Sequence, residues 1–233
     1  MDLTEKPCVI AIDGPAASGK STLAEKLAEA LDFFYFDTGV MFRAATFAAL
    51  SKLGGVGDEE AVTRLTEESQ IDVHVASCAD GRATKVLLNE EDITWAIRTR
   101  EVEANVSQVS TYAGVRKVLT ERQRQIGLRG NMVMAGRDIG TVVFPDARYK
   151  FYLDASPEER ARRRYLENKS RGGTEKYEDI LEAILRRDKI DSTREHAPLK
   201  AALDAHIINT NGKTIEEVLQ ECLEFLNLPQ HKQ

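Results

Sequence analysis

Residues 9–22 constrain the fold of this chain more strongly than any other stretch. The run Val9-Ile10-Ala11-Ile12-Asp13 is mostly apolar and rich in β-branched residues, which is typical of a buried parallel strand. The loop Gly14–Ser21 follows it and matches G-x-x-x-x-G-K-[ST] at every fixed position. Leu23, Leu27 and Leu31 then recur four residues apart, as in a helix with one apolar face.

This strand, loop and helix predict a site for a nucleoside triphosphate. Glycines let successive backbone N–H groups turn inward around an anion, and the N-terminus of the helix adds positive potential. In such a loop Lys20 can reach the β- and γ-phosphates, and the Ser21 hydroxyl can bind Mg²⁺. We therefore expect ATP or a related nucleotide to bind here with Mg²⁺.

The rest of the chain alternates between strand and helix patterns. Further strands are expected at 33–36, 131–135, 148–154 and 206–209, and helices at 40–53, 58–68, 99–127 (one or two), 158–169, 177–191 and 215–226. This alternation predicts an α/β fold with a doubly wound sheet of about five parallel strands, whose carboxyl ends hold the ligand. Residues 71–97 instead alternate with period two, which indicates a small antiparallel insertion.

Composition excludes several classes of protein. With 233 residues and 42% hydrophobic content the chain suits one soluble globular unit, and no apolar run reaches the length of a membrane span. The net charge of −6 argues against a general nucleic-acid binder. The polar segment Met1 to Lys6 shows no secretory signal, and Cys8, Cys78 and Cys222 are few and odd in number. We expect a cytoplasmic protein with reduced thiols.

Arginines are concentrated at four separate places in the sequence. They are Arg43, Arg137, the cluster Arg160–Arg164 with Arg171, and Arg187 with Arg194. Phosphoryl transfer needs positive groups where negative charge accumulates, and the guanidinium fork holds two phosphate oxygens at a time. The segment Gly136-Arg137-Asp138 follows a strand, where ligand-facing side chains are common.

Two of these arginine groups also have a plainer interpretation. Arg187, Asp191 and Arg194 lie at i, i+4 and i+7, so they could form an exposed salt-bridge ladder on one helical face. The Arg160–Arg164 run could be a solvated helix face. It precedes Arg171-Gly172-Gly173, however, a hinge-like segment expected of a lid that closes over phosphates.

Five segments together resemble the bacterial-type cytidylate kinase (CMP kinase) family, which belongs to the nucleoside monophosphate kinases among the P-loop NTPases. The likeness runs from Cys8 to about Leu226, and the fourth and fifth segments are much more specific than the first. The segments are I-D-G-P-A-A-S-G-K-S from Ile12, F-D-T-G-V-M-F-R from Phe36, N-V-S-Q-V from Asn105, G-R-D-I-G-T-V-V-F-P-D-A from Gly136 and R-D-K-I-D-S-T-R-E-H-A-P-L from Arg187.

The resemblance implies ATP-dependent phosphorylation of CMP and dCMP with Mg²⁺. It implies a core (about 1–40, 99–155 and 195–233), a monophosphate-binding region with the β insertion (about 41–98), and a helical lid with the following helix (about 156–194). ATP and CMP or dCMP would be the partners, with no nucleic acid and no membrane, and the protein would be a monomer.

The resemblance also implies a role for each matching residue. The ATP phosphates would contact Gly14, Pro15, Ala16, Ala17, Ser18, Gly19, Lys20, Ser21 and Thr22, with Ser21 on the metal. CMP would contact Thr38, Arg43, Ser107, Arg116, Arg137, Asp138, Arg187, Asp191 and Arg194. The catalytic set would be Lys20, Arg137, Arg187, Arg194, Arg160 and Arg164. Cytosine presents an N4 amine beside acceptor atoms, so a carboxylate and an arginine together can read it.

Two positions depart from the family pattern. Ala135 stands where members usually carry Asp, and Phe42 stands where they carry Tyr. A missing carboxylate would weaken Mg²⁺ positioning through its water shell, and a missing phenol removes a hydrogen bond. We expect activity to survive both changes, because Lys20, Ser21 and the arginines remain.

Three other functions stay open at this point. One is a kinase for another acceptor, such as UMP, AMP or shikimate. A second is a P-loop regulatory switch, although a GTPase would carry N-K-x-D, and the only Asn-Lys pair is followed by Ser170-Arg171. A third is a catalytically weak nucleotide binder, which Ala135 and Phe42 make conceivable.

Overall fold

The computed structural model describes residues 8–75 and 84–226. Cys78, the segment Met1 to Lys6 and residues 76–83 of the predicted insertion lie outside the described residues. Within the described ranges, no helix combines the length and apolar character needed to cross a membrane.

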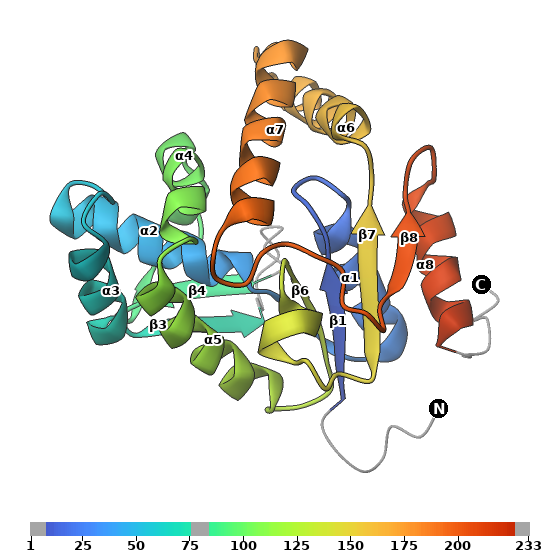
Figure 1. Ribbon diagram of the computed structural model, residues 1–233, viewed down its shortest axis with the longest axis horizontal. Coiled ribbons are helices and arrows are strands. Elements are labelled where there is room, and N and C mark those ends of the chain that lie inside the picture. The colour runs from blue at the N-terminus through green and yellow to red at the C-terminus, as the bar shows by residue number, and fades with distance from the viewer. Residues whose placement is uncertain (1–7, 76–83, 227–233) are drawn as a thin grey trace.

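Five parallel strands form the central sheet, as the alternating pattern predicts. Their order is β2-β6-β1-β7-β8, so β1 and its loop lie at the centre (Figure 1). All five residues of β1 are buried, as expected for a strand covered on both faces. The strands are β1 (Val9–Asp13), β2 (Phe34–Asp37), β6 (Met132–Gly136), β7 (Tyr149–Asp154) and β8 (His206–Asn209).

Helices cover both faces of this sheet. Because alternate residues of a strand point to opposite faces, Ile10 and Ile12 of β1 join one core cluster and Ala11 joins the other. The first cluster packs under α1 (Lys20–Leu31) and α8 (Ile215–Phe225). The second packs under α2 (Gly39–Leu53), α4 (Arg100–Val109) and α5 (Ala113–Gly127).

Residues 58–98 form a smaller unit beside α2. Its antiparallel sheet confirms the predicted insertion, and Asp58 caps α3 by accepting a hydrogen bond from the Ala61 N–H at 3.0 Å. Val86 and Ile93 pack into the same core cluster as α2, which fixes the insertion to the main body. The elements are α3 (Glu59–Glu68), β3 (Ile71–Val75), β4 (Thr84–Leu88), β5 (Glu91–Asp92) and the short helix η1 (Ala96–Arg98).

Two charged helices, α6 (Pro157–Ser170) and α7 (Tyr177–Thr193), stand above the carboxyl ends of the strands (Figure 1). Ser156 caps α6 by accepting from the Glu159 N–H at 3.2 Å, as the Ser-Pro pair predicts. The two helices share a small apolar cluster of their own, built on Ala161, Ile180 and Ile184. A pair of helices with a separate core above the ligand edge is the arrangement expected of a lid.

Two local features differ from the sequence-based expectations. The segment after β6 does not simply break the strand but forms a π-helical turn, η2 (Ile139–Val143). This turn of five residues is too short to be predicted from the periodicity of the sequence. Helix α7 ends at Thr193, so Arg194 lies just past it in an extended conformation and does not continue the helical face of Arg187 and Asp191. The predicted segment 99–127 is two helices, separated at residues 110–112.

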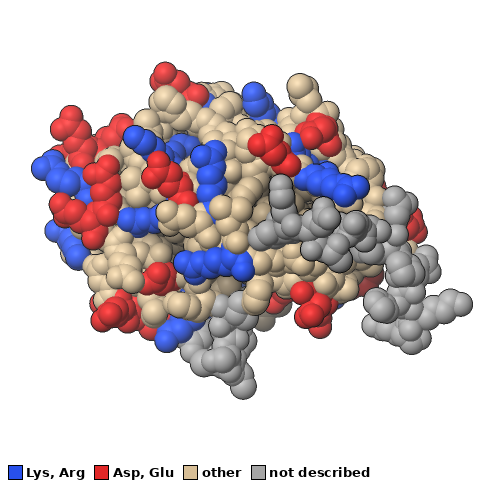
Figure 2. Space-filling view, turned by 90° about the horizontal axis from the view of Figure 1, so that it is seen from below, with Lys and Arg blue, Asp and Glu red and all other residues tan. Residues whose placement is uncertain are grey.

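The face of the molecule seen from below, away from α6 and α7, carries charge of both signs. Figure 2 shows lysine and arginine side chains interspersed with acidic ones on this face. A mixed surface of this kind provides no single-sign field that would attract a polyanion.

Candidate active site

Three strands end side by side, and each leads into a predicted site segment. The register aligns Asp13 at the end of β1 with Gly136 of β6, and Asp37 at the end of β2 with Ala135. The phosphate-binding loop (Gly14–Ser21), Thr38 and Arg137-Asp138 therefore meet at one edge of the sheet. This is where an open α/β sheet binds its ligand.

The phosphate-binding loop is tightly built around its first glycine. Gly14 has a φ of 150°, and a Cβ atom there would lie 2.4 Å from the Leu153 carbonyl oxygen, so only glycine fits. Lys20 is buried and its Nζ donates to the Pro15 carbonyl at 2.8 Å. Burial lowers the pKa of Lys20 well below its usual value, and the positive charge of Arg137 lowers it further. The buried Ser18 hydroxyl has no hydrogen-bond partner among the described residues.

Ser21 and Asp37 form an oxygen-rich pair beside Lys20. The Ser21 Oγ donates to the Asp37 Oδ2 at 3.1 Å. A hydroxyl and a carboxylate are the hard oxygen ligands that Mg²⁺ prefers, and kinases commonly hold this ion with one or two protein groups plus substrate phosphates. This pair therefore fits a Mg²⁺ ion that phosphate oxygens also bind. The described residues contain no cluster of three or more His, Cys, Asp or Glu side chains that could hold a metal ion.

Asp138 is a buried carboxylate flanked by two arginines. The Arg116 Nη2 donates to the Asp138 Oδ2 at 2.5 Å, and the Arg194 Nη2 lies 4.0 Å from Oδ1. Arg116 also donates to the Ser110 carbonyl at 3.0 Å, and its guanidinium lies 5.3 Å from the centre of the Phe42 ring. Phe42 therefore braces a predicted base contact by cation–π attraction even without a phenol.

A second arginine cluster lies between the phosphate-binding loop and α7. The Arg137 Nε donates to the Asp191 Oδ2 at 2.9 Å. The Arg187 Nε is buried and has no hydrogen-bond partner within residues 8–75 and 84–226. Burial, and then the charge of Arg137, lower the pKa of Arg187 to about 10. An exposed salt-bridge ladder does not explain a buried guanidinium nitrogen that lacks a partner, whereas a bound anion would satisfy it.

Asp191 is the carboxylate shared within this second cluster. Burial by itself would raise the pKa of Asp191, but the charges of Arg137 and Arg187 outweigh it and hold the pKa below its usual value. Lys20, Arg137 and Arg187 thus share few negative partners, which makes this part of the site attractive to phosphate.

Glu103 on α4 links arginines from opposite sides of the site. Both of its carboxylate oxygens lie 3.1 Å from the Arg164 Nη2 of α6, and Oε1 lies 3.7 Å from the Arg43 Nη2 of α2. Such partly exposed ion pairs are worth about 1 kcal/mol or less. A doubly charged phosphate can therefore displace this carboxylate from either arginine.

Arg160, predicted to contact the transferring group, is buried and already well bonded. It forms a two-pronged ion pair with Asp188 of α7, at 3.1 and 2.5 Å, and its Nη1 donates to the Ala16 carbonyl at 3.1 Å. These contacts join α6 and α7 to the phosphate-binding loop. A contact between Arg160 and the transferring group stays a prediction.

Arg163, a member of the same run, lies closer to the loop than the sequence alone indicates. A Cβ atom at Gly19 would lie 3.9 Å from its Nη1, which also donates to the Thr210 hydroxyl at 3.1 Å. Arg163 is thus a candidate functional residue. The sequence alone could not distinguish it from the other arginines of the charged run.

The remaining predicted residues lie around these clusters. The buried Thr38 donates its hydroxyl to the Ala135 carbonyl at 3.0 Å. Ser107 is partly buried on α4, and its carbonyl accepts from the Ser110 hydroxyl at 2.8 Å. Ser21 and Thr22 are exposed at the start of α1. Ala135 is 1% exposed and packs with Ile12, so apolar core fills the position where the sequence resemblance leads us to expect a carboxylate.

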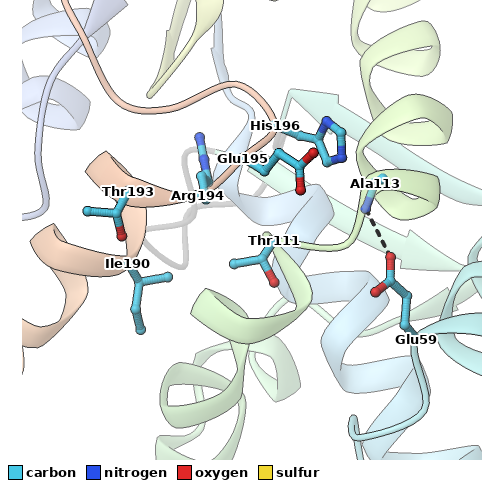
Figure 3. Close-up of a pocket in the computed structure, with 8 residues that line it drawn as sticks. All are labelled: Glu59, Thr111, Ala113, Ile190, Thr193, Arg194, Glu195 and His196. Atoms are coloured by element: carbon cyan, nitrogen blue, oxygen red, sulfur yellow. Dashed lines mark hydrogen bonds between the residues drawn. The ribbon is translucent and has the colours of Figure 1, made fainter.

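A cavity of about 370 Å³ has Arg194 in its lining. Figure 3 shows Arg194 in its lining, between the end of α7 and the junction of α4 with α5, and the hydrogen bond from the Ala113 N–H to Glu59. Of the lining residues only Arg194 was a predicted contact. The lining is Glu59, Thr111, Ala113, Ile190, Thr193, Arg194, Glu195 and His196.

A family model described as cytidylate kinase matches residues 10–228. The chain belongs to the cytidylate kinase family. Relatives with the name cytidylate kinase include one from Herpetosiphon aurantiacus, which is 48% identical over 222 residues and covers 95% of both chains. One from Bacillus licheniformis is 48% identical over 96% of this chain and 97% of its own, and one from Clostridioides difficile is 46% identical over 94% and 98%. The resemblance carried by the sequence motifs is confirmed.

Sequence reasoning missed the acidic partners of the site. The hydrogen bond between Asp37 and Ser21, the position of Glu103 between two arginines and the pairing of Asp188 with Arg160 were not predicted. Asp37 carried a usable signal, because it stands at the carboxyl end of a predicted strand next to Thr38. Glu103 and Asp188 lie on charged helical faces with no distinguishing pattern.

Proposed function

We propose that this protein transfers the γ-phosphoryl group of ATP to CMP and dCMP. In the reaction the bond between the γ-phosphorus and the bridging oxygen of ADP breaks. A bond forms from that phosphorus to an oxygen of the acceptor phosphate, so the products are ADP and a cytidine diphosphate. The observation that carries the proposal is the buried Arg116–Asp138–Arg194 array at the same sheet edge as the phosphate-binding loop.

The donor side follows from the phosphate-binding loop. The backbone from Gly14 to Thr22 and the Lys20 ammonium hold the phosphates of ATP, and binding replaces the single carbonyl that Lys20 contacts in this structure. Ser21, supported by Asp37, holds Mg²⁺, which neutralises phosphate charge when bound.

The acceptor side follows from the two arginine clusters. Arg43 binds the acceptor phosphate, while Arg137, Arg187 and Arg194, with Asp191, hold sugar and phosphates and stabilise charge in the transition state. Arg164 leaves Glu103 for the transferring group as the lid closes. Closure of the monophosphate-binding region (about 41–98) and the lid (about 156–194) over the core excludes water.

Cytosine is distinguished from uracil by Asp138. The N4 amine of cytosine donates to this carboxylate, with Thr38, Ser107 and Arg116 around the base. Uracil presents an acceptor oxygen at the same place. The Asp138 carboxylate would then face a lone pair in a buried site, which strongly disfavours the binding of uracil. We infer in addition that the protein acts as a monomer in the cytoplasm on these small substrates, and on neither nucleic acid nor membrane.

The binding of CMP and UMP to Asp138→Asn tests this proposal without relying on turnover. Calorimetry should show a wild-type preference for CMP of roughly a hundredfold or more, reduced at least tenfold in the variant. Asp146→Asn, an exposed carboxylate just beyond the π-helical turn, is the matched control and should keep the preference. Equal affinity of the wild-type protein for the two nucleotides would contradict the proposal.

A further inference from the structure

Asp13 ends β1 and immediately precedes the phosphate-binding loop. It is 4% exposed, and both oxygens of its carboxylate accept backbone hydrogen bonds. Oδ1 accepts from the Ile139 N–H at 2.8 Å and Oδ2 from the Gly140 N–H at 2.7 Å. These donors directly follow Asp138, so one carboxylate joins the start of the phosphate-binding loop to the base-reading turn (residues 138–140).

We propose that Asp13 is a positioning residue that sets the base-reading turn in register with the phosphate-binding loop. The base of the acceptor and the phosphates of the donor would then be held on one rigid frame. This role rests on the proposed function, since it presumes that Asp138 reads cytosine.

The local backbone explains why a second carboxylate is needed. The first N–H groups of any helical turn lack partners inside the turn, and an Asp at the N-cap position ordinarily accepts from them. Asp138 holds the N-cap position of η2, yet its side chain makes no capping hydrogen bond there because it pairs with Arg116. Asp13 accepts from the two N–H groups instead, which leaves the Asp138 carboxylate available to the base.

Burial of the ionised Asp13 carboxylate lowers the stability of the folded state. The pKa of Asp13 is raised to about 7, mainly by burial, while the Gly140 and Ile139 N–H groups lower it. Other charges nearby are Asp138, which raises the pKa, and Lys20, which lowers it. From β7, Tyr152 faces Asp13, and Lys150 packs against Gly140 with its ammonium held by Asp204 and the Pro145 carbonyl.

Stability and positioning respond to pH in opposite directions at this residue. Because the folded-state pKa lies above the ordinary value of 3.8, the contribution of Asp13 to stability is full below that value and is lost as the pH rises through about 7. The ionised carboxylate, which accepts both N–H groups, prevails only above about pH 7. If Asp13 only stabilised the fold, the preference for cytosine over uracil would therefore not fall as the pH falls.

The test compares the ratio of kcat/KM for CMP over UMP in the wild-type enzyme and in Asp13→Asn, from pH 6 to 8. Asn offers one acceptor oxygen and turns an N–H₂ group toward a backbone donor, so the ratio should fall at least about tenfold at pH 8. The wild-type ratio should fall between pH 8 and 6, and the variant ratio should stay flat. The acceptor phosphate titrates alike in both nucleotides, so its effect cancels in the ratio.

Lys150→Met is the matched control, because Lys150 tethers the same segment at Pro145 without touching the base-reading turn through hydrogen bonds. It should lower the melting temperature but keep the ratio. If Asp13→Asn fails to fold, the wild-type pH profile decides alone, and a flat profile would overturn the role of Asp13. If the wild-type enzyme prefers CMP over UMP and the Asp13→Asn variant has the same preference, only this role of Asp13 is overturned. A wild-type enzyme without preference for CMP overturns it together with the proposed function.

Discussion

Replacing Arg187 by methionine removes a charge from α7 while keeping an unbranched side chain of similar length. The Arg187 Nε is buried without a hydrogen-bond partner in the described part of the chain, and its pKa is lowered from 12.5 to about 10. One pKa unit corresponds to about 1.4 kcal/mol, so this lowering corresponds to an unfavourable free energy on the order of 3 kcal/mol at the Arg187 guanidinium in the ligand-free protein. The same unsatisfied charge is what would hold the transferring phosphates.

The substitution should therefore move stability and activity in opposite directions. Without nucleotide, the free energy of unfolding in urea should rise by about 1–2 kcal/mol, since part of the electrostatic cost is regained elsewhere. In a coupled assay, kcat/KM for CMP should fall by about three orders of magnitude, as when an arginine that stabilises phosphoryl transfer is removed. Binding of ATP alone should change much less.

Arg186→Met is the matched control, because Arg186 is the exposed neighbour on the same helix. It should change the free energy of unfolding by no more than about 0.5 kcal/mol and leave kcat/KM intact. A destabilised Arg187→Met variant with normal kcat/KM would refute the reasoning. Arg187 and Asp191 would then be part of a stabilising salt-bridge ladder.

Three further outcomes follow from the site. Glu103→Gln frees Arg43 and Arg164, so calorimetry should show CMP binding up to about fivefold tighter, and weaker binding would contradict the displacement of Glu103 by phosphate. Ala135→Asp places a carboxylate in apolar core, so the free energy of unfolding should fall by about 3 kcal/mol. A rise of kcat by orders of magnitude in this variant would show that Ser21 and Asp37 are not sufficient to bind the metal. At pH 9, ATP binding should be accompanied by proton uptake, because the bound phosphate raises the lowered pKa of Lys20. Calorimetry in buffers of different ionisation enthalpy measures this uptake, and the Lys20→Arg variant should show less of it. Proton release on ATP binding would contradict the prediction.

The sheet and its ligand edge could be predicted from the sequence because local patterns specify them. Continuous apolar runs indicated the parallel strands, and the G-x-x-x-x-G-K-S loop placed the donor phosphates at the end of β1. The cap of α6 at Ser156 and the antiparallel character of residues 71–88 were likewise legible from local patterns.

The contacts of Asp13, Glu103 and Asp188 could not be predicted, because each joins residues far apart in the chain. Asp13 and Ile139 are separated by 126 positions, Glu103 and Arg164 by 61, and Asp188 and Arg160 by 28. Only the tertiary fold brings these pairs together. The end of α7 before Arg194 is a similar case, since that side chain is positioned by Asp138 and Ser110 and not by helical spacing.

The central claim is phosphoryl transfer to a cytosine nucleotide, and an ADP-release assay tests it most directly. The purified protein would be supplied with ATP and Mg²⁺ and, in turn, with CMP, dCMP, UMP, AMP and GMP. We predict rapid ADP release with CMP and dCMP, and release with the other three nucleotides no faster than without an acceptor. Slow release that is independent of the acceptor, or equal turnover of UMP, would contradict the account.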